Sequence, residues 1–222
     1  MARQQERARR TRAALVESAA LEFARRGYSA ASVNTILEGS HTTKGAMYFH
    51  FQSKEDLARA VLEAGVEQFT ELTARWSDRV DLDPFVVLHA LLRDLARMFD
   101  ESVIAQAEFR LIIEPEFYSE VQSGGSQVWG RTAYALARRA SEMGLLREGA
   151  DPGRFTRVLA ATLAGQRYMT DLTALDGGLE DRFLEALGVV LDAMAAPEWL
   201  AKLEAEGWPE IEPDLPRETQ ET

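Results

Sequence analysis

The sequence predicts an all-α protein of about nine or ten helices, on three observations. Ala, Leu, Arg and Glu, which are strong helix formers, dominate the 222 residues. No run of four or more residues shows a clean alternation of apolar and polar side chains bounded by turn residues, so strands are not expected. Apolar residues instead recur at helical spacing between Gly and Pro breakpoints.

The first helix is expected to run from Glu6 to Arg26. Gly27 is expected to end it, because Gly readily adopts the left-handed conformation of a helix C-cap. Its apolar side chains should cover one broad buried face. They are Leu15, Ala19, Leu21, Phe23 and Ala24.

Two short helices joined by a turn are expected next. Ser32 is placed to cap the first of them, and its Val33, Ile36 and Leu37 should face inward. Residues 39–42 then form the turn, and Thr43 is placed to cap a second short helix over residues 44–49. Three bulky side chains are expected to anchor this second helix: Met47, Phe49 and Phe51.

A long helix and a series of further helices complete the predicted chain. Ser53 is placed to cap the long helix, which is expected to end near Trp76. Pro84 and Pro197 are placed to open later helices, since Pro is favoured in the first helical turn. The later helices are expected over residues 84–101, 103–113, about 127–143, 154–173, 179–195 and 197–206.

Composition excludes several classes of function. The chain has no cysteine, which excludes disulfide scaffolds, Cys-ligated zinc, iron–sulfur clusters and thiol nucleophiles. Its apolar runs fall short of the ~18 residues of a membrane helix, and its basic start lacks a signal-peptide core, so a cytoplasmic protein is expected. Residues 77–222 hold no metalloprotease, serine hydrolase or nucleotide-binding motif, so no enzyme activity, cofactor or metal is expected.

The net charge of −11 is divided unevenly along the chain. Residues 1–60 carry ten basic and six acidic side chains, a net of +4. Residues 61–222 carry 15 basic and 30 acidic side chains, a net of −15. A positive first segment can approach phosphates, while the acidic remainder should lower non-specific affinity for DNA by repulsion.

The strongest functional signal lies in residues 32–57. Two short helices that are joined by a tight turn and framed by longer helices make a helix-turn-helix. The second short helix carries small or hydrogen-bonding side chains where it would meet DNA. The candidate DNA-binding residues are Thr42, Thr43, Lys44, Gly45, Tyr48, His50, Lys54 and Arg10.

Each of these residue types suits a contact with phosphates or base edges. Gly45 permits close approach of the backbone, and Lys44 supplies a positive charge. Tyr48 and His50 offer hydrogen-bond donors. Thr43, at a free helix N-terminus, can meet a phosphate.

Two basic regions outside the short helix extend the predicted interface. Lys54, at the start of the long helix, is placed to clamp the DNA backbone beside the groove. Arg10 belongs to an arginine-rich arm over residues 3–12 that suits a phosphate or minor-groove contact. A merely solvated helix start explains this arm equally well.

These motifs resemble the TetR family of one-component transcriptional repressors. The resemblance covers roughly residues 10–60 and rests on Gly27-Tyr28, on Ser32-Val33 with Ile36, and on TKGAMYFHFQSKEDL at residues 43–57. Residues 44–51 are most similar to the γ-butyrolactone-receptor branch of actinomycetes. The resemblance implies a homodimer that binds a palindromic double-stranded DNA operator and releases it when a small molecule enters the C-terminal domain.

The turn departs from the pattern of the family. Ser40, His41 and Thr42 stand where the family usually has Ala-Gly-Val. The Gly normally takes a left-handed conformation, which His tolerates at some cost, and the hydroxyl of Thr42 needs a hydrogen-bond partner. Either the turn is less rigid than usual, or His41 and Thr42 contact DNA themselves.

Polar residues within apolar helical stripes indicate a candidate ligand pocket. Thr162 and Gln166 share a helix face with the apolar positions Phe155, Val158, Leu159, Leu163 and Met169. Trp129 and Thr132 align in the same way on the helix before it. Apolar walls with a few hydrogen-bonding groups are typical of ligand pockets. An ordinary core with satisfied polar groups explains these residues equally well.

The resemblance favours the pocket, because γ-butyrolactone receptors carry a pocket tryptophan at the position of Trp129. It implies a small hydrophobic signalling ligand of γ-butyrolactone type and a role in secondary metabolism. Many of these receptors have Gln where this chain has Gly65, which favours a pseudo-receptor or a multidrug or antibiotic sensor instead. An interaction protein without DNA binding and an all-helical enzyme are further alternatives.

The predicted domain organisation follows from these assignments. Residues 1–53 form the helix-turn-helix DNA-binding domain, residues 54–208 a ligand-binding and dimerisation domain, and residues 209–222 an acidic flexible tail. The resemblance implies that the helices over 154–173 and 179–195 pair with their symmetry mates. The apolar residues of 179–195 fit a monomer core equally well: Phe183, Leu184, Leu187, Val190, Leu191 and Met194. His89 is expected to be a satisfied histidine beside the core.

Overall fold

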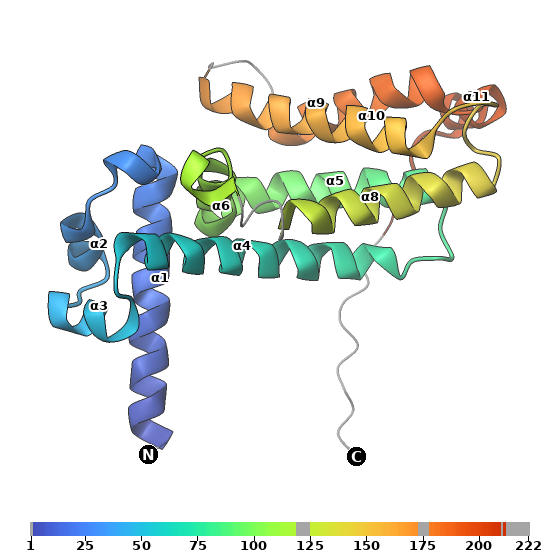
Figure 1. The fold of residues 1–222 in the computed structure, drawn as a ribbon. Helices are drawn as coiled ribbons and strands as arrows, with labels where there is room; N and C mark the ends of the chain where they lie inside the picture. The colour runs from blue at the N-terminus through green and yellow to red at the C-terminus, as the bar shows by residue number, and fades with distance from the viewer. Residues whose placement is uncertain (1, 119–124, 173–177, 210, 212–222) are drawn as a thin grey trace, which may run out of the picture. The chain divides into compact units, whose positions relative to one another are not determined.

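The computed structural model describes residues 2–118, 125–172, 178–209 and 211, and the helices in this part of the chain confirm the all-α prediction (Figure 1). The α-helices are α1 (Ala2–Ala30), α2 (Val33–Gly39), α3 (Lys44–His50), α4 (Lys54–Ser77), α5 (Pro84–Glu101), α6 (Val103–Leu111), α8 (Gly125–Glu142), α9 (Pro152–Leu172), α10 (Leu179–Met194) and α11 (Pro197–Glu206). A 3-10 turn over Pro115–Phe117, which the sequence did not predict, follows α6. The predicted tail falls almost entirely outside the described residues.

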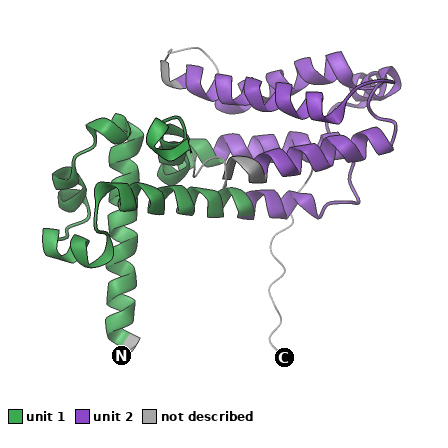
Figure 2. Ribbon diagram, viewed as in Figure 1, with its two compact units in different colours: residues 1–70, 98–128 green, residues 71–97, 129–222 purple. Residues whose placement is uncertain are grey.

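The chain divides into two compact units, which Figure 2 colours separately. Unit 1 comprises Met1–Thr70 and Met98–Val128, and unit 2 comprises Glu71–Arg97 and Trp129–Thr222. This grouping joins α6 to the N-terminal helices, whereas the sequence placed a boundary at residue 53. The functional domain boundaries stay a prediction.

The break expected at Gly27 is present as a kink inside α1. Gly27 has φ 73° and ψ 174°, and helical residues resume after it up to Ala30. A side chain would be strained at this positive φ, and a Cβ there would also lie 3.2 Å from Oε1 of Glu114. Gly27 therefore permits both the kink and the close approach of the segment after α6.

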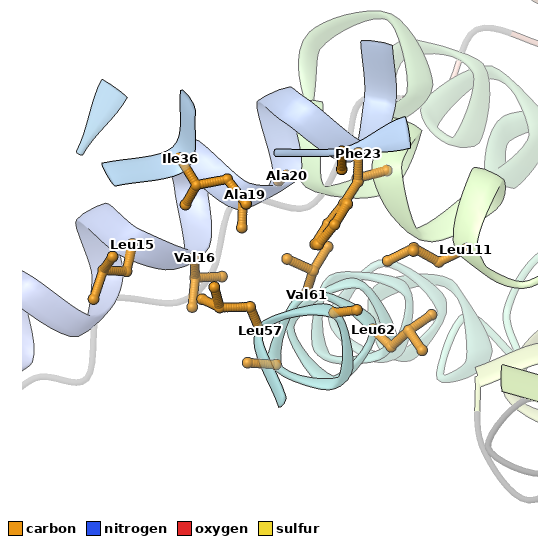
Figure 3. Close-up of a cluster of buried hydrophobic side chains, with 14 of the residues drawn as sticks. Leu15, Val16, Ala19, Ala20, Phe23, Ile36, Leu57, Val61, Leu62 and Leu111 are labelled. Atoms are coloured by element: carbon orange, nitrogen blue, oxygen red, sulfur yellow. The ribbon is translucent and has the colours of Figure 1, made fainter. Parts of the chain in front are cut away.

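The core of unit 1 holds the short helices in place, because buried side chains of four helices converge there. Figure 3 shows the apolar side chains of α1, α2, α4 and α6 pointing toward one another. The fully buried members include Leu15, Ala19, Phe23, Ile36, Leu57, Val61 and Leu111. Leu21, which was expected on this face, is 43% exposed, because it lies about 200° around the helix from Ala19.

The core of unit 2 includes a cluster of aromatic rings. The Phe85 ring stacks on Phe155, with their centroids 5.7 Å apart, and Nε1 of Trp199 donates a hydrogen bond to Asp83 at 2.7 Å. His89 stacks on Trp208 with the centroids 4.0 Å apart. Burial, followed by the positive charge of a nearby arginine, lowers the pKa of His89 to about 4. His89 thus lies beside the core, as expected.

Helices α9 and α10 pack against each other within unit 2. The apolar positions Phe183, Leu187, Val190 and Leu191 of α10 are buried there, so the monomer core accounts for these four. Val158 and Met169 of α9, which were expected to face inward, are exposed. Both lie about 80–100° around the helix from the buried Leu159, away from the buried residues of α9. The prediction for these two residues was wrong.

Candidate nucleic-acid interface

One buried side chain fixes each of the two short helices on the core of unit 1. Ile36 anchors α2 and Met47 anchors α3, and both are almost completely buried. The hydroxyl of Ser18 donates a 2.8 Å hydrogen bond to the carbonyl of Ile36. A Cβ on Gly39 would lie 2.5 Å from that hydroxyl oxygen, so the absence of a side chain at Gly39 permits α2 to lie against α1. These contacts hold α2 against α1, and the burial of Met47 fixes α3 on the same core.

Hydroxyl groups brace the turn between α2 and α3. His41 has φ 51° and is the one non-glycine residue with positive φ in the described part of the chain. This is the left-handed conformation expected at the position where the family usually has Gly. Thr42 finds the partner that its hydroxyl needs, because Oγ1 lies 2.8 Å from Oγ of Ser40. The Ser40 hydroxyl in turn donates to the carbonyl of Ile36 at 2.8 Å. Polar contacts thus replace the apolar packing that a valine would provide.

Two of the three predicted N-caps make the expected hydrogen bond. Oγ1 of Thr43 accepts from the backbone N–H of Ala46 at 3.2 Å, and Oγ of Ser53 accepts from the N–H of Asp56 at 3.0 Å. The side chain of Ser32 makes no such bond. Its backbone N–H donates instead to the buried carboxylate of Glu22 at 3.0 Å. A carboxylate of α1 therefore takes part in ordering the start of α2.

The outward face of α3 carries four of the predicted DNA-binding residues. The side chains of Thr43, Lys44 and Tyr48 are exposed, and a Cβ built on Gly45 would meet nothing within 4 Å. Lys44 Nζ lies 6.0 Å from the centroid of the Tyr48 ring. A cation, a phenol hydroxyl and a bare stretch of backbone thus lie within about one helical turn of each other on the exposed side of α3. Such groups suit contacts with phosphates and base edges. The side chains of Thr42 and His50 are partly buried beside them.

Phe49 is not an anchor of α3, as the sequence had suggested, but is 79% exposed. The reason is helical geometry. Met47 and Phe51 are four residues apart and lie on the same side, whereas Phe49 lies about 200° around the helix from Met47. Strict helical spacing measured from Met47 would have predicted this position.

Lys54 has a structural role that the sequence did not show. Its ammonium group donates to the carbonyls of Tyr28 at 2.8 Å and Ala31 at 3.2 Å, with a longer contact to Ser29 at 3.4 Å. It also lies 4.5 Å from the centroid of the Tyr28 ring. The three donors of the ammonium group are directed at carbonyls that follow the kink of α1. A contact of Lys54 with DNA stays a prediction, beside this role in joining α1 to α4.

The arginine-rich arm is the exposed first part of α1. Arg10 Nε lies 3.2 Å from a carboxylate oxygen of Glu6, and both side chains are exposed, so their attraction is weak. The guanidinium of Arg12 lies 5.3 Å from the centroid of the Phe51 ring. The arm therefore presents positive charge beside the segment that follows α3.

The four candidate ligand-binding residues lie in unit 2. Trp129 and Thr132 on α8, and Thr162 and Gln166 on α9, are all half-buried. The hydroxyl of Thr162 donates to the carbonyl of Val158 at 2.8 Å, so its proton is directed to its own helix. A groove of about 620 Å³ lies elsewhere, in unit 1, and is bordered by Arg12, Glu17, Glu63, Glu67 and Glu101. A pocket at the four predicted residues stays a prediction.

Gly65, the position that departs from the receptor pattern, packs against Glu108 of α6. A Cβ on Gly65 would lie 2.6 Å from Cγ of Glu108, so no larger residue fits there without movement. Glu108 is buried, and burial raises the pKa of its carboxyl to about 7. This pairing could not be predicted from the sequence, since no spacing rule links residues 43 positions apart.

Groups of three or more side chains that could hold a metal ion do not occur among the described residues. None of the described helices is long and apolar enough to span a bilayer. The exposed side chains of α3 include a lysine and a phenol hydroxyl, which are groups that can contact a polyanion.

Comparisons with known proteins agree with this geometry. Residues 15–61 match the model of the tetR family of bacterial regulatory proteins, a range that spans α2, α3 and parts of α1 and α4. The A-factor receptor protein of Streptomyces griseus is 29% identical over 206 residues, which cover 91% of this chain and 70% of that protein.

Two solved structures are similar to the chain in both fold and sequence. One, described as a γ-butyrolactone receptor (ArpA-like protein), is 25% identical with a TM-score of 0.71 and covers 88% of this chain and 94% of its own. The other, described as the molecular basis for control of antibiotic production by bacterial hormones, is 31% identical with a TM-score of 0.68. It covers 84% of this chain and 98% of its own.

Proposed function

The chain belongs to the TetR family of bacterial regulatory proteins, and we propose that it represses transcription by binding a palindromic operator as a homodimer. It is a transcriptional repressor related to γ-butyrolactone receptors, and regulators of this family bind DNA operators and small ligands and act as dimers. The operator contacts proposed here are made by Thr42, Thr43, Lys44, Gly45, Tyr48, His50, Lys54 and Arg10.

The observation that supports this proposal most is the outward face of α3. Met47 holds the helix on the core, so that Lys44, Gly45 and Tyr48 are presented to solvent. A helix of this kind enters the major groove, where its side chains reach base edges while neighbouring cations contact phosphates. A two-fold dimer would place two copies of α3 at half-sites one helical turn or a multiple of it apart.

The exposed apolar side chains of α9 and α10 support the dimer. Val158, Met169 and Val189 are exposed on these two helices although each is apolar. Apolar side chains that the monomer leaves exposed are available for contact with a second copy. We therefore place the homodimer contact on α9 and α10.

The proposed ligand is a small hydrophobic signalling molecule of γ-butyrolactone type, bound by Trp129, Thr132, Thr162 and Gln166. The names of the A-factor receptor and of the γ-butyrolactone receptor support this ligand class. Binding would change operator affinity by about 5–150-fold, which corresponds to a coupling free energy of about 1–3 kcal/mol. Control of secondary metabolism is the process that such a signal would serve.

A second candidate keeps the repressor and changes the ligand. The pairing of Gly65 with the buried carboxyl of Glu108 favours it, because a Gln at residue 65 would not fit beside Glu108. A pseudo-receptor or a sensor of antibiotics and other drugs would answer a molecule other than a butyrolactone.

The experiment that tests both proposals is capture of genomic fragments by the immobilised protein, followed by elution. Retention of one or a few defined fragments supports the repressor, and retention of DNA without sequence preference contradicts it. Elution by a synthetic γ-butyrolactone supports the first ligand class. Elution by antibiotics or culture extract but not by the butyrolactone supports the second.

A further inference from the structure

Phe49 is exposed to an extent that no other large apolar side chain of the described residues reaches, at 79%. It lies on α3, at the centre of the proposed interface. Burial of a phenyl ring is favourable, so a partner that covers the Phe49 ring gains binding free energy from this contact.

The ring occupies the outermost line of the helix. Phe49 and Gly45 are one turn apart and lie about 160–200° around the helix from the buried Met47. A Cβ on Gly45 would meet nothing within 4 Å, so the surface beside the ring is bare backbone. The outermost line of α3 thus carries the ring with bare backbone one turn before it, beside the exposed Lys44 and Tyr48.

One neighbouring ring contacts the Phe49 side chain. His50 meets it edge to face, with the centroids 5.0 Å apart and the planes at 87°. His50 in turn lies 6.4 Å from the ring of the buried Phe51.

We propose that Phe49 reads a thymine in each half-site by packing its ring on the C5-methyl group. This inference rests on the proposed function and adds a base preference to it. The edges of the other bases in the major groove present hydrogen-bond donors and acceptors, and the thymine methyl is the apolar group among them. A phenyl ring packed against a polar base edge would remove water from the donors and acceptors of that edge without replacing their hydrogen bonds. The ring therefore favours thymine at the base pair that it contacts.

The test uses deoxyuridine, which pairs like thymine and lacks only the methyl group. The probe is the shortest genomic fragment that the wild-type protein retains, synthesised once with thymine and once with deoxyuridine throughout. Removing a methyl contact worth about 0.8 kcal/mol weakens binding about fourfold at one half-site, and hence about 15-fold for both. Wild-type protein should show this loss in a fluorescence anisotropy titration.

Phe49→Ala should bind the thymine fragment more weakly and show no further loss with deoxyuridine. Phe49→Leu, which keeps apolar surface, should retain part of the sensitivity. Tyr118→Ala, another exposed aromatic side chain of unit 1, serves as the matched control and should behave as the wild type. Thermal melting of each variant checks that the fold is intact, which the exposure of Phe49 predicts.

Equal affinity of the wild type for both fragments would overturn the inference, and so would an equal loss in wild type and Phe49→Ala. The failure of the proposed function looks different, because the wild type would then bind neither fragment in preference to scrambled DNA.

Discussion

The hydroxyl oxygens of Ser40 and Thr42 lie 2.8 Å apart, across His41 with its φ of 51°. The turn of the helix-turn-helix is therefore fixed by a hydrogen bond between two side chains, where a Gly-Val sequence would rely on backbone freedom and an apolar contact. Of the two expectations for this turn, reduced rigidity is not supported by these contacts. Contact of His41 or Thr42 with DNA stays a prediction.

The turn predicts an asymmetric response to substitution at residue 41. His41→Gly removes the free-energy cost of a left-handed backbone, about 1–2 kcal/mol. Glycine also stabilises the unfolded state by about 0.5–1 kcal/mol through its greater conformational entropy, so the free energy of unfolding should be equal or slightly higher. His41→Val should lower the free energy of unfolding by more than 1 kcal/mol, since a β-branched residue is poorly tolerated at positive φ. Urea denaturation measures both variants. A stable His41→Val protein would contradict the assignment of the turn.

Lys44 and Lys54 should differ in what their removal does to DNA binding. Lys44→Ala should weaken binding to all DNA and reduce the slope of log affinity against log salt by about 1, because one phosphate contact is lost. Lys54→Met should in addition lower the free energy of unfolding by about 1–3 kcal/mol, because the charged donor at the carbonyls of Tyr28 and Ala31 is lost.

The two roles are separated by measuring affinity for the operator fragment at salt concentrations from about 50 to about 300 mM. An unchanged slope for Lys44→Ala would remove Lys44 from the contacts. A reduced slope for Lys54→Met would show that Lys54 also neutralises a phosphate.

Glu108 should make stability depend on pH. Its pKa is raised from 4.5 to about 7 in the folded protein, so the folded state binds more protons than the unfolded state between these values. Stability contributed by the protonated carboxyl is therefore present below pH 4.5 and is lost as pH rises toward and past 7. The loss amounts to about 3 kcal/mol.

The matched variant is Glu108→Gln, which keeps size and removes the titration. Its free energy of unfolding minus that of the wild type should increase by about 3 kcal/mol between pH 4.5 and pH 8. A difference that is constant across this range would show that the carboxyl does not titrate there.

Trp129 should affect ligand response more than operator binding. Trp129→Ala removes a half-buried ring from α8, far along the chain from α3, so operator affinity should stay within about twofold. Release by the eluting ligand should need at least about tenfold more of it, since loss of a large aromatic contact weakens binding by 1.4 kcal/mol or more. Loss of operator binding as well would indicate a purely structural tryptophan.

The sequence was sufficient where local rules decide the structure. Thr43 and Ser53 cap their helices as expected, Pro84 and Pro197 open theirs, and Gly27 carries the break in α1. Capping and backbone freedom depend on a few adjacent residues, so they can be predicted from the chain alone.

The sequence was insufficient where contacts between distant segments decide the structure. Lys54 bonds to carbonyls more than 20 residues away, and Glu108 packs on Gly65 of another helix. Phe49 was misplaced because hydrophobicity alone suggested burial, although helical spacing pointed outward. Which stripe of a short helix meets the core depends on its neighbours, and these are set by tertiary packing.

The central claim is that α2–α3 recognises a specific DNA sequence. The most direct measurement is the ratio of the dissociation constants for scrambled DNA and for the captured genomic fragment, at about 150 mM salt, by fluorescence anisotropy. A sequence-specific repressor gives a ratio of about 10³ or more. A ratio near one, with both constants equally dependent on salt, would contradict the claim.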